Sequence, residues 1–242
     1  MTYAFPPGGL PDQSRDPEST AVFTTAYAVI PAECQRDIVT SFLPDWAWVL
    51  ARPLSGFAET FAQYALELSP GGGSDAPDPD RDAQTVLFVA HGDVQLTIGH
   101  KSFDLTAGSY AYLPPATDWA LWNRQNAPCG LHWIRKRYQP VKGLTPPMAF
   151  VTHETDVPPL AMPDTDGVWA TQRFVDPLDL AHDMHVNIVT FQPGGRIPFA
   201  ETHVMEHGLF VLQGTAEYLL NKDWISVGPG DFMWLRAFCP QA

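Results

Sequence analysis

Short apolar runs separated by turn-forming residues are the feature that most constrains the fold of this chain. The 242 residues include 24 prolines and 18 glycines, which recur between apolar runs such as 85–90, 94–98 and 108–113. Proline interrupts helices and central strands, and glycine supplies the backbone conformations that tight turns require. Frequent turns between short strands are typical of β-sandwiches and β-barrels. We therefore predict an all-β fold, and the hydrophobic content of 45% is sufficient for a large core.

One order of elements occurs twice in the chain. Between residues 85 and 115, strand-like runs and glycine-containing turns follow the order strand, Gly, strand, Gly-turn, strand. The same order returns between residues 194 and 240, with Gly214 at the position of Gly92. An internal repeat of this kind indicates that one structural unit is duplicated. The sequence therefore predicts two copies of one β domain.

The second copy contains a group of side chains that is typical of a metal site. Glu201, His203 and His207 have the same parity, and residues of one parity point to one face of an extended strand. A carboxylate with two neutral imidazoles is a ligand set for divalent metals. Turn-forming residues at 193–195 and Gly214 bound the segment, which reads as two short strands and a tight turn. We predict a metal site here; the alternative is a polar, solvent-exposed strand face.

Two segments of the second copy together resemble the sequence motifs of the cupin superfamily. The first motif has the pattern Gly, His-x-His, Glu, Gly, and here its last four positions are held by Glu201, His203, His207 and Gly214. The second motif is Pro-x-Gly followed by His. Here Pro229 and Gly230 match it, and Gln241 stands at the position of the His. The resemblance adds Gln241 to the candidate ligands.

The order Glu, His, His, Gln is unusual among cupins and resembles that of the (S)-ureidoglycine aminohydrolase family, whose members contain two cupin domains. The run 201–208 and the segment 223–231 both match that family. The resemblance implies a Mn²⁺ ion held by Glu201, His203, His207 and Gln241. It also implies hydrolysis of (S)-ureidoglycine to (S)-ureidoglycolate and ammonia, a step of allantoin and purine catabolism.

Three residues are candidates for contact with the substrate. In the family the metal-bound Glu and Gln also touch the substrate, so the resemblance gives Glu201 and Gln241 a catalytic role as well. Tyr218 lies on the strand after Gly214 and is the third candidate, with a core or rim aromatic as the alternative. Glu206 has the opposite parity, and we expect it behind the ligands or at the surface.

The first copy lacks a comparable ligand set. Counting back from Gly92 as from Gly214 places its four ligand positions at Pro79, Arg81, Thr85 and Trp119. These side chains do not form a metal site. We therefore expect the N-terminal cupin to be a structural half whose barrel is filled by Trp119 and Trp122, and only the C-terminal half to bind metal.

These observations divide the chain into four segments. We predict an N-terminal arm with the first strands at 1–50, a cupin without a metal site at 51–139, a proline-rich connection at 140–167 and a metal-binding cupin at 168–242. The predicted fold is thus two tandem cupin (jelly-roll β-barrel) domains. A cupin barrel has further strands after the second motif, and the family has a Tyr and a Lys there that contact the substrate. Because this chain stops at Ala242, we expect the second cupin to be truncated at its C-terminus.

Composition argues against several kinds of partner. The net charge is −13 without a Lys/Arg cluster, which argues against nucleic acid and anionic membranes as partners. The start of the chain lacks the basic and apolar regions of a signal peptide, and no stretch approaches the ~20 apolar residues of a membrane span. The three scattered cysteines, Cys34, Cys129 and Cys239, indicate neither a disulfide framework nor a zinc knuckle. We expect a cytoplasmic protein that acts on a small molecule and, with an open sheet edge, forms a homo-oligomer.

Two other functions are left open by the sequence. The set of two His and one carboxylate is also the pattern of non-haem Fe(II) oxygenases, although Gln241 as a fourth ligand leaves fewer positions for O₂. Oxygen uptake with Fe²⁺ would identify such an enzyme. The second alternative is a non-catalytic cupin, or an inactive remnant without the residues that hold the substrate.

Overall fold

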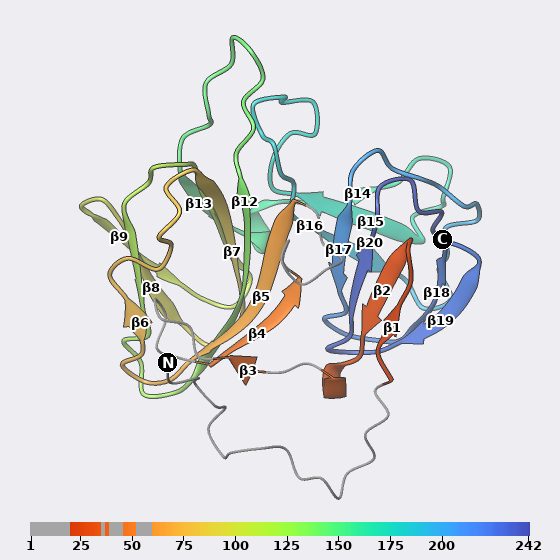
Figure 1. Ribbon diagram of the computed structural model, residues 1–242, viewed down its shortest axis with the longest axis horizontal. Helices are drawn as coiled ribbons and strands as arrows, with labels where there is room; N and C mark the ends of the chain where they lie inside the picture. Colours follow the sequence, from red (N-terminus) through yellow and green to blue (C-terminus); the bar gives the residue numbers. More distant parts are fainter. Residues whose placement is uncertain (1–19, 35–36, 39–45, 52–59) are drawn as a thin grey trace, which may run out of the picture.

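The described part of the chain consists almost entirely of strands. The computed structural model describes residues 20–34, 37–38, 46–51 and 60–242. In these ranges the only helices are two short 3-10 turns, η1 (Ala32–Cys34) and η3 (Glu154–Asp156), and neither is long and apolar enough to cross a membrane. Figure 1 shows two β units side by side, one orange to green and the other mainly blue. The prediction of an all-β fold is confirmed.

The N-terminal unit consists of two antiparallel sheets around one core. The larger sheet has the strand order β13-β10-β7-β12-β5-β4-β3, and the smaller has the order β6-β11-β8-β9. The larger sheet contains β3 (Asp37–Ile38), β4 (Trp46–Ala51), β5 (Phe61–Leu68), β7 (Ala83–His91), β10 (Ser109–Leu113), β12 (Cys129–Arg137) and β13 (Phe150–His153). The smaller contains β6 (Gly73–Ser74), β8 (Val94–Ile98), β9 (Lys101–Leu105) and β11 (Trp119–Trp122). Apolar side chains from both sheets form one buried cluster, which includes Leu87 and Leu96.

The two tryptophans expected to fill the N-terminal barrel have different environments. Trp119 belongs to the buried cluster and meets Trp133 edge to face, with 6.0 Å between the ring centroids. Trp122 is only partly buried, and its indole N–H donates to Asp75 Oδ1 at 2.8 Å. Trp119 therefore occupies the core, whereas Trp122 anchors a loop beside it.

The C-terminal unit contains three smaller sheets, with the orders β1-β2-β20-β17, β14-β15-β16 and β18-β19. Its strands are β1 (Val22–Phe23), β2 (Tyr27–Ile30), β14 (Leu160–Ala161), β15 (Trp169–Arg173), β16 (Asn187–Phe191), β17 (His207–Phe210), β18 (Ala216–Leu220), β19 (Asp223–Val227) and β20 (Phe232–Leu235). β2 precedes the whole N-terminal unit in the sequence, yet it pairs with β20. Figure 1 shows this red strand among the blue ones. β1 and β2, from the start of the described chain, thus belong to the same sheet as β17, whose first residue is His207.

Residues 140–167, predicted as a proline-rich connection, also contribute strands to both units. β13 pairs with β10 at the edge of the seven-stranded sheet, and β14 pairs with β15. The segment therefore joins the units by adding an edge strand to each of them.

The predicted duplication is visible in the strand positions. β8 and β9 span 94–98 and 101–105, and β18 and β19 are the same two strands 122 residues later. The same shift relates Trp119 to Gln241. Trp119 pairs with Ile98, and Gln241 pairs with Leu220. Trp119 and Gln241 therefore hold equivalent places in the two units.

A buried interface connects the two units. Phe61 and Val86 of the seven-stranded sheet share one apolar cluster with Ile30 and Phe232 of the C-terminal unit. The ring of His132 on β12 lies 4.3 Å from that of Phe210 on β17, measured between centroids. Each large side chain buried in this way contributes about 1.5–3 kcal/mol to folding. The seven-stranded sheet of the N-terminal unit therefore packs against β17.

Candidate metal centre

The segment with the predicted ligands is not one continuous strand. Glu201 forms an isolated β-bridge, the chain bends at Val204 and Met205, and β17 begins only at His207. The expectation that the three ligands share one face of an extended strand is therefore wrong. Residues 202–206 are assigned to no strand in the described structure, and the two histidines lie on either side of a bend.

The backbone of Gln241 pairs with that of Glu201. The two residues exchange both backbone hydrogen bonds, each with 2.9 Å between nitrogen and oxygen. Gln241 is also bridged to Leu220, and only 5% of its surface is exposed. The backbone pairing brings the ends of the two motifs together although 40 positions separate them in the sequence.

The candidate ligands contact one another in pairs. His203 Nε2 lies 3.5 Å from Glu201 Oε1, and these side chains are 37% and 32% exposed. The rings of His203 and His207 have centroids 4.7 Å apart. The backbone carbonyl of His203 accepts a hydrogen bond from the N–H of Phe238 at 2.7 Å, which ties the bend to the end of the chain.

Tyr218 contacts the candidate ligand Gln241. Its hydroxyl donates to Gln241 Oε1 at 3.0 Å. Burial raises the pKa of Tyr218 to about 12, and the charge of Glu201 adds to the rise. The hydroxyl thus stays protonated near neutral pH and acts as a donor. A carbonyl oxygen has two lone pairs, so Gln241 Oε1 has one left for a metal or a substrate.

The environment of His207 keeps its imidazole neutral. Desolvation lowers the pKa of His207 to about 4, and the neighbouring His203 contributes in the same direction. A neutral imidazole has a free lone pair, which is the form that binds metals. At neutral pH a metal ion therefore does not compete with a proton at His207.

The donor set fits a divalent ion in its chemistry. It offers two imidazole nitrogens and two oxygens, without a thiolate. In the ranges that the structure describes, however, no three His, Cys, Asp or Glu side chains lie close enough together to hold a metal ion. The predicted ligands thus meet in pairs, and their assignment as one coordination shell stays a prediction.

Glu206 has contacts that the sequence did not indicate. Its carboxylate accepts hydrogen bonds from Thr60 of the N-terminal unit and from the indole of Trp234 on β20. We expected this residue behind the ligands or at the surface, but its partner Thr60 is 146 positions away in the chain. A local pattern holds no signal for such a contact.

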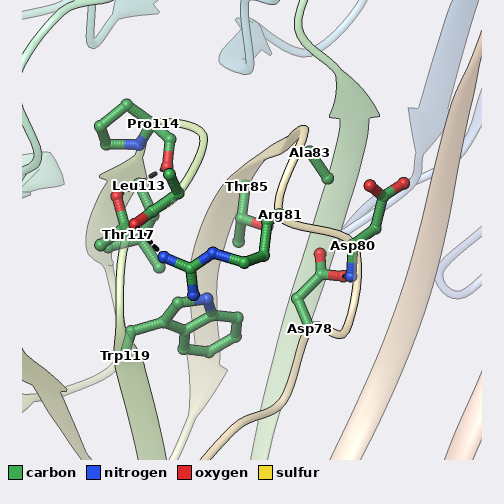
Figure 2. Close-up of a pocket in the computed structure, with 10 residues that line it drawn as sticks. Asp78, Asp80, Arg81, Ala83, Thr85, Leu113, Pro114, Thr117 and Trp119 are labelled. Atoms are coloured by element: carbon green, nitrogen blue, oxygen red, sulfur yellow. Dashed lines mark hydrogen bonds between the residues drawn. The ribbon is translucent and has the colours of Figure 1, made fainter.

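The equivalent place in the N-terminal unit is a small cavity (Figure 2). Arg81, Thr85 and Trp119, three of the four counted positions, line it together. The Arg81 guanidinium extends toward the opposite loop, where it pairs with Asp118 at 2.8 Å. The cavity volume of about 20 Å³ is enough for one water molecule. Asp78 and Asp80 also line the cavity, and an N-terminal half without metal stays a prediction.

Comparison with known proteins identifies relatives over most of the chain. Residues 55–138 match the family of EutQ-like cupin domains. The (S)-ureidoglycine aminohydrolase of Arabidopsis thaliana is 31% identical over 226 residues, which are 91% of this chain and 72% of the relative. The protein of the same name from Escherichia coli K12 is 29% identical over 207 residues, 86% of this chain and 77% of the relative.

Solved structures agree with the cupin fold. A putative glyoxylate-induced protein from Pseudomonas aeruginosa is 57% identical, with a TM-score of 0.85 over 100% of this chain and 90% of that one. Protein Ylba from E. coli is 26% identical, with a TM-score of 0.81 over 92% and 88%. The oxalate decarboxylase of Lactobacillus farciminis, at 13% identity and a TM-score of 0.64 over 91% and 82%, shares the fold alone.

Proposed function

Because the chain belongs to the (S)-ureidoglycine aminohydrolase family, we propose that it converts (S)-ureidoglycine and water into (S)-ureidoglycolate and ammonia. The observation that carries this proposal is the pairing of Glu201 with Gln241, which brings the ends of the two cupin motifs to one place. The buried amide of Gln241 and the neutral ring of His207 further support a ligand-binding centre there.

The reaction exchanges one bond at the central carbon of the substrate. The bond to the amino nitrogen breaks, the nitrogen takes up a proton and leaves as ammonia, and the water oxygen bonds to the carbon and gives up a proton. No electrons are gained or lost. Because water gives up a proton and the leaving amine takes one up, the reaction needs a group that transfers a proton between them. In the proposed set the Glu201 carboxylate can do so, and its partial exposure leaves it accessible to substrate.

The other candidate residues orient groups and do not move protons. Tyr218 stays protonated near neutral pH because its pKa is about 12, and its hydrogen bond holds the Gln241 amide with Oε1 toward the phenol. His203 Nε2 lies 3.5 Å from Glu201 Oε1 and so occupies one side of the carboxylate. Stereochemical control then follows from the fixed directions of these groups around one reacting carbon.

We propose that Glu201, His203, His207 and Gln241 together hold one Mn²⁺ ion. Such an ion, when bound, supplies Lewis acidity and a positive charge that suits the substrate carboxylate. The donor set of two nitrogens and two oxygens favours Mn²⁺, Fe²⁺ or Zn²⁺ over soft metals, and the choice of Mn²⁺ follows the family resemblance. We also expect a homo-oligomer, which light scattering of the purified protein tests.

The proposal is tested by ammonia release. Purified protein with Mn²⁺ and freshly prepared (S)-ureidoglycine is expected to release ammonia and to form only (S)-ureidoglycolate, detected by circular dichroism. His203→Ala is expected to lower the rate at least about 100-fold, since it removes a ligand. His100→Ala, an exposed histidine of the N-terminal unit, is the matched control and should keep full activity. Racemic product at the spontaneous rate contradicts the proposal, and oxygen uptake with Fe²⁺ would support the oxygenase alternative.

A further inference from the structure

In the sequence Glu206 stands between the candidate ligands His203 and His207, yet its carboxylate accepts hydrogen bonds from other parts of the fold. Oε1 accepts hydrogen bonds from the backbone N–H and the hydroxyl of Thr60, both at 2.5 Å, and from the N–H of Phe61 at 3.3 Å. Oε2 accepts from Trp234 Nε1 at 2.8 Å. One carboxylate thus connects the bend after His203, the start of β5 in the N-terminal unit, and β20.

The residue on the other side of His207 is also held against β5. A Cβ added to Gly208 would lie 2.8 Å from Gln63 Oε1 and 2.9 Å from Phe61 Cζ. Such distances are shorter than van der Waals contact, so a larger residue here would force these two side chains or the backbone to shift. Both chain neighbours of His207 therefore lie against the N-terminal unit.

These contacts connect the N-terminal unit, for which the sequence predicts no metal site, with the candidate metal centre. Building on the proposed function, we propose that Glu206 is a positioning residue. It ties the bend at 204–206 to β5 and β20, and so directs the imidazole of His207 toward the bound ion. His203 Nε2 and the Glu201 carboxylate, 3.5 Å apart, then meet a third ligand whose direction is fixed.

The carboxylate suits this position because Thr60, Phe61 and Trp234, its partners among the described residues, are all donors. Three N–H or O–H groups face Oε1 and one N–H faces Oε2. Glutamine has nearly the same shape, but one end of its amide is an NH₂ group. In Glu206→Gln that NH₂ must face either Thr60 and Phe61 or the indole of Trp234. Two donors then point at each other, and the bend has to move.

The test measures Mn²⁺ binding, which does not depend on turnover. We expect Glu206→Gln to raise the Mn²⁺ dissociation constant about 10- to 100-fold, as is usual when a partner behind a metal ligand is lost. The electron paramagnetic resonance spectrum of the bound Mn²⁺ should change as well, because it reports the arrangement of ligands. Thr60→Val keeps the side-chain shape and removes one hydroxyl, so it should fold normally and bind Mn²⁺ about threefold to tenfold more weakly.

Asp183→Asn is the matched control. Asp183 also joins the two units with one carboxylate, which accepts from Lys136 Nζ, Gln84 Nε2 and the N–H of Gln139. None of these partners is a candidate ligand or a neighbour of one, so this variant loosens the interface without touching the bend. We expect it to lower the melting temperature while the Mn²⁺ affinity and spectrum stay unchanged.

The possible outcomes separate this inference from the proposed function. If the wild-type protein binds Mn²⁺ and Glu206→Gln binds it equally well, the positioning role is refuted and the proposed function stands. An equal loss of affinity in Asp183→Asn also refutes it, because general loosening would then explain the effect. If the wild-type protein binds no Mn²⁺, the proposed metal centre and the positioning role both fail.

Discussion

The hydroxyl of Tyr218 is where a single-atom change tests the candidate centre. It donates to Gln241 Oε1 at 3.0 Å, and with a pKa of about 12 it stays protonated at neutral pH. A protonated phenol that donates here faces the oxygen of the amide and not its nitrogen. Tyr218→Phe removes this constraint and keeps the ring.

The expected magnitude follows from one neutral hydrogen bond. Such a bond contributes about 1 kcal/mol, which corresponds to about a fivefold preference for the amide orientation seen here. Without it, the Gln241 amide can rotate and present its nitrogen, which is not a metal ligand. We therefore expect Tyr218→Phe to raise the Mn²⁺ dissociation constant about fivefold, while the melting temperature falls by about 2–4 °C.

Calorimetric titration with Mn²⁺ near pH 7 measures the effect, and Tyr27→Phe is its control. The hydroxyl of Tyr27 donates to Asp223 Oδ2 at 2.8 Å, and the pKa of Tyr27 is also raised to about 12, mainly by burial. This variant loses a comparable hydrogen bond in the same unit. Among the described residues, the Tyr27 hydroxyl has no hydrogen bond to a candidate ligand, so the affinity should equal that of the wild type. Equal affinities for wild type and Tyr218→Phe, or equal losses in both variants, would refute the reasoning.

Three further predictions concern the surroundings of the centre. Gly208→Ala places a Cβ 2.8 Å from Gln63 Oε1, and we expect denaturant unfolding to show a loss of about 1–3 kcal/mol; an unchanged midpoint would contradict the close approach. Arg81→Gln removes one exposed ion pair in the N-terminal cavity, so metal analysis should find the stoichiometry unchanged and stability should change by less than about 1 kcal/mol. Desolvation lowers the pKa of His132 from 6.5 to about 4, so between these values the unfolded chain binds more protons and stability falls as the pH drops. His132→Leu should flatten that fall in thermal unfolding from pH 7 to pH 4, and an equal slope would argue against it.

Local patterns in the sequence predicted much of this fold. The alternating run 94–98 is β8, and the glycine turn after it leads to β9, as expected. Counting from Gly92 and Gly214 placed Trp119 and Gln241 at equivalent positions, and their strand pairings agree. These predictions succeed because strand alternation and glycine turns act within a few residues.

Contacts between distant segments could not be predicted in this way. The bend at Val204 and Met205 interrupts the strand on which the ligand parity depended. The bond from Thr60 to Glu206 and the pairing of β2 with β20 join residues far apart in the sequence. Such contacts depend on how the two units pack, and the hydrophobic period of a segment indicates only its local secondary structure.

The most direct test is the metal content of the purified protein, measured by mass spectrometry of the elements after dialysis with Mn²⁺. If Glu201, His203, His207 and Gln241 hold one ion, the wild-type protein retains one Mn²⁺ per chain and His203→Ala retains almost none. A wild-type protein without bound metal, or a His203→Ala variant with the same content as the wild type, would contradict a metal centre at these four residues.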